Sequence, residues 1–209
     1  MNTKPIIIFD FDGTISDSVV AMFEAINDLS PRLGFRKIKN EEYAEFRKMS
    51  TKGMVNELKI KKESIPEILK GIHRGLAERA ESLKPVEGIT KVLESLSERG
   101  YKMYIVTSNT KTNVENLLNR FKIDFFSGIY SESGLYGKSD LINKLIVDSG
   151  VQKEQIVYMG DETRDVEAGK KCGIKTMAVT WGLNGKEALQ EKYPDWLIET
   201  PEELLKIFR

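Results

Sequence analysis

The sequence predicts a doubly wound α/β fold, in which a Rossmann-like parallel sheet carries a helical insertion behind its first strand. Two observations support this prediction. Five short runs rich in apolar and β-branched residues are each followed by a polar turn and a helical pattern. Such runs are typical of strands buried on both faces, with helices as the crossovers between parallel strands. The region from about residue 18 to residue 84 breaks this alternation and shows helical periodicity instead.

The predicted strands follow one another in a regular order along the chain. They are PIIIFD at 5–10, YKMYIVTS at 101–108, FFSGIYS at 125–131, EQIVYMGD at 154–161 and KTMAVTWG at 175–182. Helices over 88–99 and 138–149 are expected to end at Gly100 and Gly150, because glycine commonly follows a helix C-terminus. A last helix is expected after Thr200, with Pro201 in its first position.

The inserted region is predicted to be helical because its apolar residues recur at helical spacing. Examples are the sets Met22, Ala25, Ile26, Leu29 and Ile65, Ile68, Leu69, Ile72. Each set lies on one helix face, which we expect to be buried internally while the other side meets the strand ends. The predicted domains are therefore an α/β core of residues 1–16 and 85–209 and a helical cap of residues 17–84.

Composition excludes several classes of function. Lys plus Arg and Asp plus Glu both number 32, so no net charge steers the chain to nucleic acid or to an anionic membrane. The single Cys172 excludes an intramolecular disulfide and is expected to be a small packed residue. The N-terminus lacks the pattern of a signal peptide, and no stretch approaches the roughly 20 apolar residues of a membrane helix. We expect a cytoplasmic, soluble monomer or homodimer.

Polar residues gather where the predicted strands end. The first strand ends in Asp10 and Asp12, and the second in Thr107 and Ser108 followed by Asn109. The segment YSESGLYGK delivers Lys138, and GDETRD follows the fourth strand with Asp161 and Asp165. Residues just past parallel strands share one crevice, so these side chains are expected to converge. Taken singly, Asp10 and Asp12 also suit a turn, and Thr107 and Ser108 suit a helix cap.

This combination of residues favours phosphate chemistry. Crowded carboxylates repel one another unless a cation lies among them, and oxygen ligands without a Cys/His cluster suit Mg²⁺ better than zinc. A bound cation would make an aspartate usable as a nucleophile on phosphorus. Asp12 lies two residues after Asp10 on the same face of an extended chain, where it is placed to donate a proton to the leaving oxygen. Thr107 and Lys138 would hold phosphoryl oxygens.

Four segments in order resemble the motifs of the haloacid-dehalogenase-like hydrolase superfamily. They are DFDGT after the first strand, VTSN after the second, the lysine at 138, and GDETRD after a later strand. The resemblance covers essentially the whole chain, because the helical insertion matches the position of that family's helical cap. The stretch from Gly160 to Gly182 is most similar to the phosphoglycolate-phosphatase-like branch.

The resemblance implies a role for each motif residue. Asp10 would be the nucleophile that becomes an aspartyl-phosphate, and Asp12 the general acid and base. Thr107, Ser108 and Lys138 would bind phosphate. Asp161 would hold Mg²⁺ together with a carboxylate oxygen of Asp10 and the backbone carbonyl of Asp12. Dehalogenases of the superfamily lack the second aspartate, so Asp12 indicates a phosphatase acting on a small phosphorylated metabolite.

Several further residues have an expected role or position. Asp165 is expected to hold a metal-bound water or to orient Lys138, and Gly13 to allow a tight turn near phosphate. Arg47, Lys48 and Lys52 lie in the cap, where this family tends to place specificity residues, and a solvated connection is the equal alternative. His73 is expected at the surface or in helix packing, and Glu162 and Arg164 are expected at the surface or behind the site. Trp181 and Trp196 are expected to be structural residues.

Three alternative functions remain open from the sequence. A phosphomutase like β-phosphoglucomutase would use the same scaffold and return the phosphoryl group to a sugar, and a pyrophosphatase would cleave a phosphoanhydride. A phospho-acceptor or binding module without turnover, like the receiver domains of two-component signalling, would also combine acids, a hydroxyl and a lysine. The inserted cap and the spacing of Asp10 and Asp12 do not suit a receiver domain. A dinucleotide-binding protein would need a glycine-rich fingerprint after the first strand, which is absent.

Overall fold

The computed structural model describes residues 4–131 and 137–209, and its centre is one parallel sheet. The six strands lie in the order β5-β4-β1-β6-β7-β8. They are β1 (Ile6–Phe9), β4 (Met103–Thr107), β5 (Phe126–Ser131), β6 (Ile156–Gly160), β7 (Lys175–Val179) and β8 (Trp196–Ile198). The chain runs from β1 outward to β5 and then returns to β6 on the other side of β1. This reversal leaves a crevice at the carboxyl ends of the central strands, where doubly wound folds bind their ligands.

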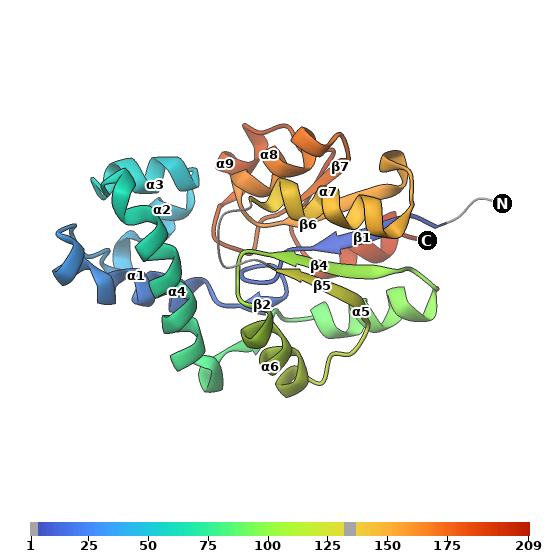
Figure 1. The fold of residues 1–209 in the computed structure, drawn as a ribbon, viewed down its shortest axis with the longest axis horizontal. Coiled ribbons are helices and arrows are strands. Elements are labelled where there is room, and N and C mark those ends of the chain that lie inside the picture. The colour runs from blue at the N-terminus through green and yellow to red at the C-terminus, as the bar shows by residue number, and fades with distance from the viewer. Residues whose placement is uncertain (1–3, 132–136) are drawn as a thin grey trace.

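Helices cover both faces of the sheet (Figure 1). One face is covered by α7 (Lys138–Ser149) and α8 (Thr163–Cys172), with the short α9 (Lys186–Gln190) beside α8. The other face is covered by α5 (Ile89–Glu98), α6 (Lys111–Phe121) and α10 (Leu204–Ile207). The apolar runs of the central strands are explained by this arrangement, because β1 and β6 are buried at every position.

The strand β1 shows how the sequence builds this core. Ile6 and Ile8 pack with residues of α7 and α8, whereas Ile7 and Phe9 pack with residues of α5, α6 and α10. All four side chains are buried. Burying each stabilises the fold by about 1.5–3 kcal/mol relative to exposure. The strand is thereby held rigidly from both sides, and so is the residue that follows it, Asp10.

A helical insertion lies between β1 and β4, at the carboxyl edge of the sheet (Figure 1). Its helices are α1 (Val19–Leu33), α2 (Tyr43–Arg47), α3 (Thr51–Glu57) and α4 (Ile65–Glu78). The helices α1 and α4 pack closely, because a side chain at Gly71 or Gly75 would overlap Leu29 or Ala25 respectively. The insertion therefore forms a packed unit of its own at the end of the sheet where the ligand crevice lies.

A short antiparallel ribbon joins the insertion to the core. It consists of β2 (Ser16–Asp17) and β3 (Lys84–Pro85), with Ser16 opposite Pro85 and Asp17 opposite Lys84. The chain thus leaves and re-enters the core through paired strands. The predicted fold class, a Rossmann-like sheet with an inserted helical cap, is confirmed. The exact domain boundaries stay a prediction.

Most of the predicted helices and strands are confirmed, and the structure also contains short strands that were not predicted. All five predicted strands are present, and α5 and α7 match the predicted helices. The last helix begins with a 3-10 turn at Pro201–Glu203 before α10. The strand β8 and the ribbon of β2 and β3 were not predicted. Cys172 is buried, as expected of a packed residue.

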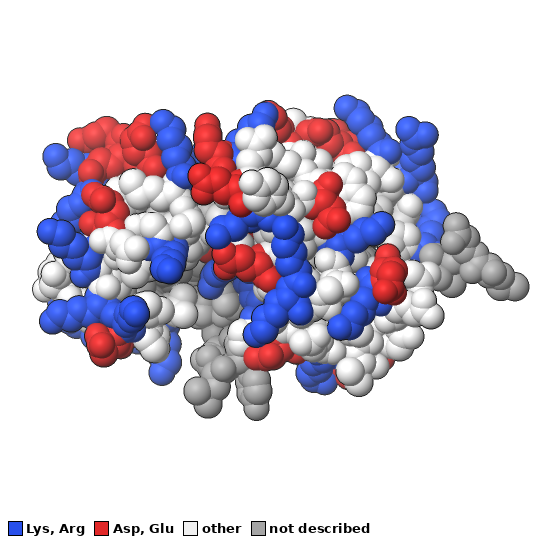
Figure 2. Space-filling view, turned by 90° about the horizontal axis from the view of Figure 1, so that it is seen from above, with Lys and Arg blue, Asp and Glu red and all other residues white. Residues whose placement is uncertain are grey.

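The surface of the structure carries both signs of charge (Figure 2), in agreement with a net charge of zero. Figure 2 shows Lys and Arg side chains interspersed with Asp and Glu over one face of the molecule. Among the helices in the described ranges, none is long and apolar enough to cross a membrane.

Candidate active site

The structure brings the predicted site residues together at the carboxyl edge of the sheet. Asp10 follows β1, Thr107 ends β4 and Asp161 follows β6, while Lys138 begins α7. All four are buried. Part of the YSESGLYGK segment, residues 132–136, lies outside the described residues. Charged groups buried this thoroughly need partners, which the following contacts provide.

Asp10 is held by the ammonium group of Lys138. Lys138 Nζ donates a hydrogen bond of 2.6 Å to Asp10 Oδ2 and also donates to Asp165 Oδ1. Burial raises the pKa of Asp10 to about 7, although the charge of Lys138 opposes this rise. The lysine itself keeps its charge, because the carboxylates of Asp10 and Asp165 outweigh burial and raise its pKa. Asp10 is therefore a fixed carboxylate at the base of the crevice.

Asp165 contacts Lys138 and two further hydrogen-bond donors. In addition to the lysine, its carboxylate accepts hydrogen bonds of 2.9 Å from the Tyr158 hydroxyl and from the Glu162 backbone N–H. A side chain at Gly160 would overlap the Asp165 carboxylate. Both oxygens of Asp165 are therefore engaged, and its role in orienting Lys138 stays a prediction.

The Asp161 carboxylate accepts hydrogen bonds from two segments that are distant in the sequence. Its Oδ1 accepts from Thr14 Oγ1 at 2.9 Å, and its Oδ2 accepts from the Leu183 backbone N–H at 2.7 Å. A side chain at Gly13 or Gly182 would overlap the Asp161 carboxylate, and Gly13 has a positive φ of 76°. Burial, followed by the charge of Asp10, raises the pKa of Asp161 well above its usual value.

Asp12 is oriented by a residue at the end of β4. Asn109 Nδ2 donates to Asp12 Oδ2 at 2.8 Å, and Asn109 Oδ1 in turn accepts from the Thr110 backbone N–H. Within residues 4–131 and 137–209, Asp12 Oδ1 is buried without a hydrogen-bond partner. Burial raises the pKa of Asp12 to about 6. Phe11 points into the core between the two acids, so Asp10 and Asp12 both face the crevice.

The acids suit a hard divalent cation. Asp10, Asp161 and Asp165 each offer a carboxylate oxygen, and these oxygens lie within 4.8 Å of one another. The donor set contains oxygen only, and burial followed by the charges of neighbouring carboxylates raises the pKa values of Asp10 and Asp161. A cation would relieve the repulsion between these carboxylates, so the residues present fit Mg²⁺. Asp165 also accepts from Lys138, Tyr158 and the Glu162 backbone N–H, so we expect Asp10 and Asp161 to be the carboxylates that would hold such a cation.

The end of β4 provides hydroxyl groups to the crevice. Thr107 Oγ1 accepts from the Asn109 backbone N–H at 3.1 Å, and Ser108 Oγ lies 3.4 Å from Arg164 Nη2. The following helix α6 is capped by Thr110, whose hydroxyl accepts from the Asn113 N–H. Thr107 and Ser108 are therefore not required as the cap, and both line the pocket above Asp10.

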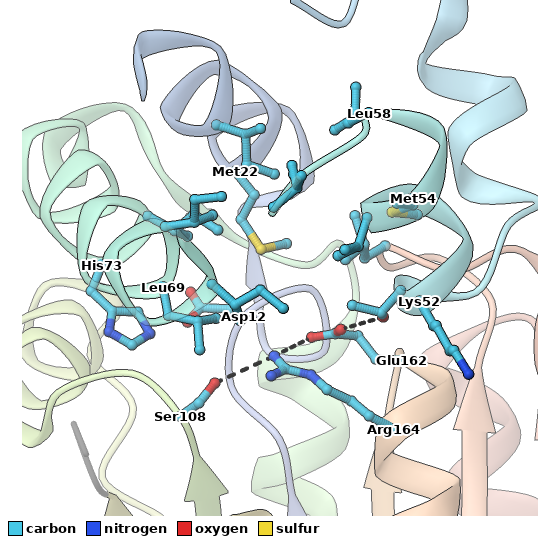
Figure 3. A pocket seen from close by; sticks show the side chains of 18 of the residues that line it. Asp12, Met22, Lys52, Met54, Leu58, Leu69, His73, Ser108, Glu162 and Arg164 are labelled. Atoms are coloured by element: carbon cyan, nitrogen blue, oxygen red, sulfur yellow. Dashed lines mark hydrogen bonds and ion pairs between the residues drawn. The ribbon is translucent and has the colours of Figure 1, made fainter. Parts of the chain in front are cut away.

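A pocket of about 530 Å³ lies between the insertion and the core (Figure 3). Its floor is polar and consists of Asp10, Asp12, Thr107, Ser108, Glu162 and Arg164. Its roof is apolar and includes Ile26, Val55, Ile60, Ile65, Leu69 and Ile72. Figure 3 shows Met22 and Leu58 at the roof end, with Ser108 and Arg164 at the opposite end.

Glu162 and Arg164, which were expected at the surface or behind the site, both line this pocket. Glu162 is buried, accepts from Arg164 and also accepts from Thr51 Oγ1 of the insertion at 2.8 Å. Glu162 stands directly before α8, and Arg164 lies in the first turn of that helix. His73 of α4 also lines the pocket, and burial lowers its pKa to about 4, so it is neutral near pH 7.

The three cap residues singled out from the sequence lie in different places. Lys52 lines the pocket, with its ammonium group directed away from the cavity centre in Figure 3. Arg47 instead donates to the backbone carbonyls of Gly182 and Thr180, both at 2.9 Å. Lys48 is exposed and pairs with Glu45. Arg47 therefore fastens the insertion to the loop that also holds Asp161.

The fold and the site together define a hydrolase that acts on phosphoric monoesters. The chain belongs to the haloacid dehalogenase-like hydrolases, because the model of that family matches residues 7–179. The family resemblance inferred from the four motifs is thereby confirmed.

Individual relatives agree with this assignment. The chain is 33% identical over 201 residues to a phosphoglycolate phosphatase of Synechococcus elongatus, covering 96% of this chain and 95% of the relative. It is 24% identical over 210 residues to the pyrophosphatase PpaX of Bacillus cereus, covering 96% and 94% respectively. A haloacid dehalogenase-like hydrolase structure from Streptococcus pneumoniae matches all of both chains with a TM-score of 0.82 and 25% identity.

Proposed function

We propose that the protein is a Mg²⁺-dependent phosphatase that hydrolyses a small phosphorylated metabolite through an aspartyl-phosphate on Asp10. The observation that carries this proposal is the position of Asp10. It is a buried carboxylate, fixed by Lys138 at 2.6 Å, and it lines the floor of a pocket large enough for a substrate. Asp12 lines the same floor two residues later.

The proposed reaction has two steps. A carboxylate oxygen of Asp10 attacks phosphorus, the ester P–O bond breaks, and the leaving oxygen takes a proton from Asp12. Asp12 then removes a proton from water, which attacks phosphorus and releases phosphate and the Asp10 carboxylate. Burial raises the pKa of Asp12 to about 6, which brings the protonated form that the first step requires closer to neutral pH. Asn109 keeps the Asp12 carboxyl group directed to the floor.

The remaining floor residues hold the phosphoryl group and its charge. Lys138, the hydroxyl groups of Thr107 and Ser108, and backbone N–H groups at the end of β4 would bind phosphoryl oxygens. When bound, Mg²⁺ supplies positive charge that offsets the repulsion between carboxylate and phosphate. Carboxylate oxygens of Asp10 and Asp161 and the backbone carbonyl of Asp12 would hold it.

We propose that residues 17–84 act as a cap over a core of residues 1–16 and 85–209. The hydrogen bond from Thr51 to Glu162 and those from Arg47 to the loop at 180–182 join the two parts. Closure of the cap would exclude water during phosphoryl transfer and bring its side chains to the leaving group.

Removing divalent cations is expected to abolish activity, and adding Mg²⁺ is expected to restore it. The measurement is free-phosphate release from p-nitrophenyl phosphate after treatment with EDTA. A panel of phosphoglycolate, pyrophosphate, nucleotides and sugar phosphates then compares the substrate classes suggested by the relatives. Release of phosphate would support hydrolysis, whereas accumulation of an isomerised sugar phosphate would support the phosphomutase. Full activity in EDTA would contradict the metal requirement.

A glycine substitution tests the Asp161 position independently. Gly13→Ala is expected to raise the Mg²⁺ concentration for half-maximal activity by about ten- to a hundredfold, because the new methyl group displaces the Asp161 carboxylate. Gly34→Ala is the matched control, since Gly34 has a similar φ of 74° and an added side chain there meets no atom within 4 Å.

Both glycine variants are expected to lose about 1–2 kcal/mol of stability from the left-handed backbone. Only Gly13→Ala should change the Mg²⁺ dependence. Equal Mg²⁺ dependence of the two variants would show that Asp161 does not depend on the Gly13 turn.

A further inference from the structure

The roof of the pocket is far more apolar than a small charged substrate requires. Its six aliphatic side chains come from α1, α3, α4 and the connection between α3 and α4. Each of these six side chains is only partly buried. This is unexpected for aliphatic residues, because the insertion has a packed interior in which they could be buried. Apolar surface left open to water is unfavourable, so a ligand that covers the roof would be bound more tightly.

The cations that line the pocket do not belong to the apolar roof. Among the described residues that line it, the cations are Lys52, Lys62 and Arg164. Lys52 and Lys62 are exposed, and the Arg164 guanidinium is paired with Glu162. His73 is neutral near pH 7, because burial lowers its pKa to about 4. A second anionic group on the substrate would therefore find no cation among the six roof side chains themselves.

The cavity is present while the insertion is attached to the core. Thr51 donates to Glu162 at 2.8 Å, Arg47 donates to the Gly182 carbonyl at 2.9 Å, and Asn113 of α6 donates to the His73 carbonyl at 3.1 Å. These contacts span the pocket on different sides. The space between roof and floor is consequently not the result of a detached cap.

The volume of the cavity also indicates a ligand with more than a phosphate group. At about 530 Å³ it falls within the range of roughly 300–1,000 Å³ that is common for pockets enclosing whole organic ligands. A phosphoryl group over Asp10 would fill the floor only. The remaining volume lies against the roof.

Building on the proposed phosphatase function, we propose that the substrate is a phosphomonoester whose alcohol part is apolar, such as an alkyl chain or a hydrocarbon ring. The phosphoryl group binds at the floor, and the apolar part lies against the roof. The side chains of Leu69 and Val55 then determine specificity, because both line the cavity from different helices.

The test compares methyl, butyl, hexyl and octyl phosphate with the wild-type protein and Mg²⁺, by free-phosphate release. The value of kcat/KM is expected to rise about three- to fourfold for each methylene group that the roof covers. Phosphoglycolate is expected to be a poorer substrate than hexyl phosphate. Leu69→Gln should lower kcat/KM for hexyl phosphate about tenfold or more relative to methyl phosphate.

Matched variants separate specificity from folding. Val147→Gln makes a similar change at a side chain of α7 that is 79% exposed, and it should leave the whole series unchanged. Val55→Thr alters the roof almost without changing its shape, so it provides the same test if Leu69→Gln does not fold. It should also flatten the dependence on chain length.

The failures of the two proposals are distinguishable. Equal kcat/KM across the alkyl series, or phosphoglycolate hydrolysed better than hexyl phosphate, would overturn the apolar substrate and leave the phosphatase function intact. Absence of hydrolysis for every phosphomonoester with Mg²⁺ present would overturn the phosphatase function itself.

Discussion

Asp10→Asn is expected to lower hydrolysis of p-nitrophenyl phosphate by at least about ten-thousandfold, because an amide cannot form the acyl phosphate. The variant should fold. Burial raises the pKa of Asp10 to about 7, so the folded protein disfavours a charge at this position and accepts a neutral side chain of the same shape. Lys138 retains Asp165 as its partner. The change in unfolding free energy is therefore expected to stay within about 1 kcal/mol.

The control for this variant is Asp17→Asn, which makes the same change at an exposed aspartate of β2. It should retain wild-type activity. Acid-quenched wild-type protein should carry an acyl phosphate that hydroxylamine removes, and Asp10→Asn should not. Near wild-type hydrolysis by Asp10→Asn would rule out Asp10 as the nucleophile.

The core of this fold is predictable from the sequence because its signal is local. A run such as Ile6–Phe9 is apolar at every position only if both faces of the strand are covered, and the helices that cover them follow in the chain. The strands of such a sheet end at one edge. The convergence of Asp10, Thr107 and Asp161 therefore follows from their positions after the strands.

The elements that were not predicted depend on contacts between distant segments. The strand β8 has three residues and pairs only with β7 among the described strands. Ser16–Asp17 is polar and becomes a strand by pairing with Lys84–Pro85 on the far side of the insertion. Segments this short have no periodicity of their own, so the pairing partner decides their conformation.

Prediction of the pocket from the sequence is limited in a similar way, because it depends on where the side chains point. Helical spacing indicated the apolar set Ile65, Ile68, Leu69 and Ile72, but it does not distinguish a face packed against another helix from a face that lines a cavity. The sequence also indicated the positive charge of Arg47 in the insertion. Its direction toward the Gly182 carbonyl depends on how the insertion lies over the core.

Lys138→Met is expected to affect both stability and activity. The lysine side chain is 6% exposed and lies between Asp10 and Asp165, so its loss leaves two buried carboxylates without their cation. Removing one partner of a buried ion pair typically costs about 3–5 kcal/mol. Activity should fall about a hundred- to a thousandfold, because a positive group that stabilises the phosphoryl oxygens is lost.

The control Lys144→Met removes a lysine from the same helix, where its side chain is 64% exposed and pairs with Asp148 four residues later. That change is expected to cost less than about 0.5 kcal/mol, because exposed pairs contribute little. Urea unfolding in EDTA measures both variants. Equal stability of Lys138→Met and Lys144→Met would contradict the buried ion pair.

A double variant shows which carboxylate the lysine serves. Adding Asp165→Asn to Lys138→Met removes one of the two unpaired charges, so it should recover part of the lost stability, with a coupling of about 0.5–3 kcal/mol. Activity should not recover, since the cation that faces Asp10 is still absent. If stability recovers without activity, the lysine has two separable roles: it neutralises Asp165 in the folded core, and it holds the nucleophile and the phosphoryl group at the floor of the pocket.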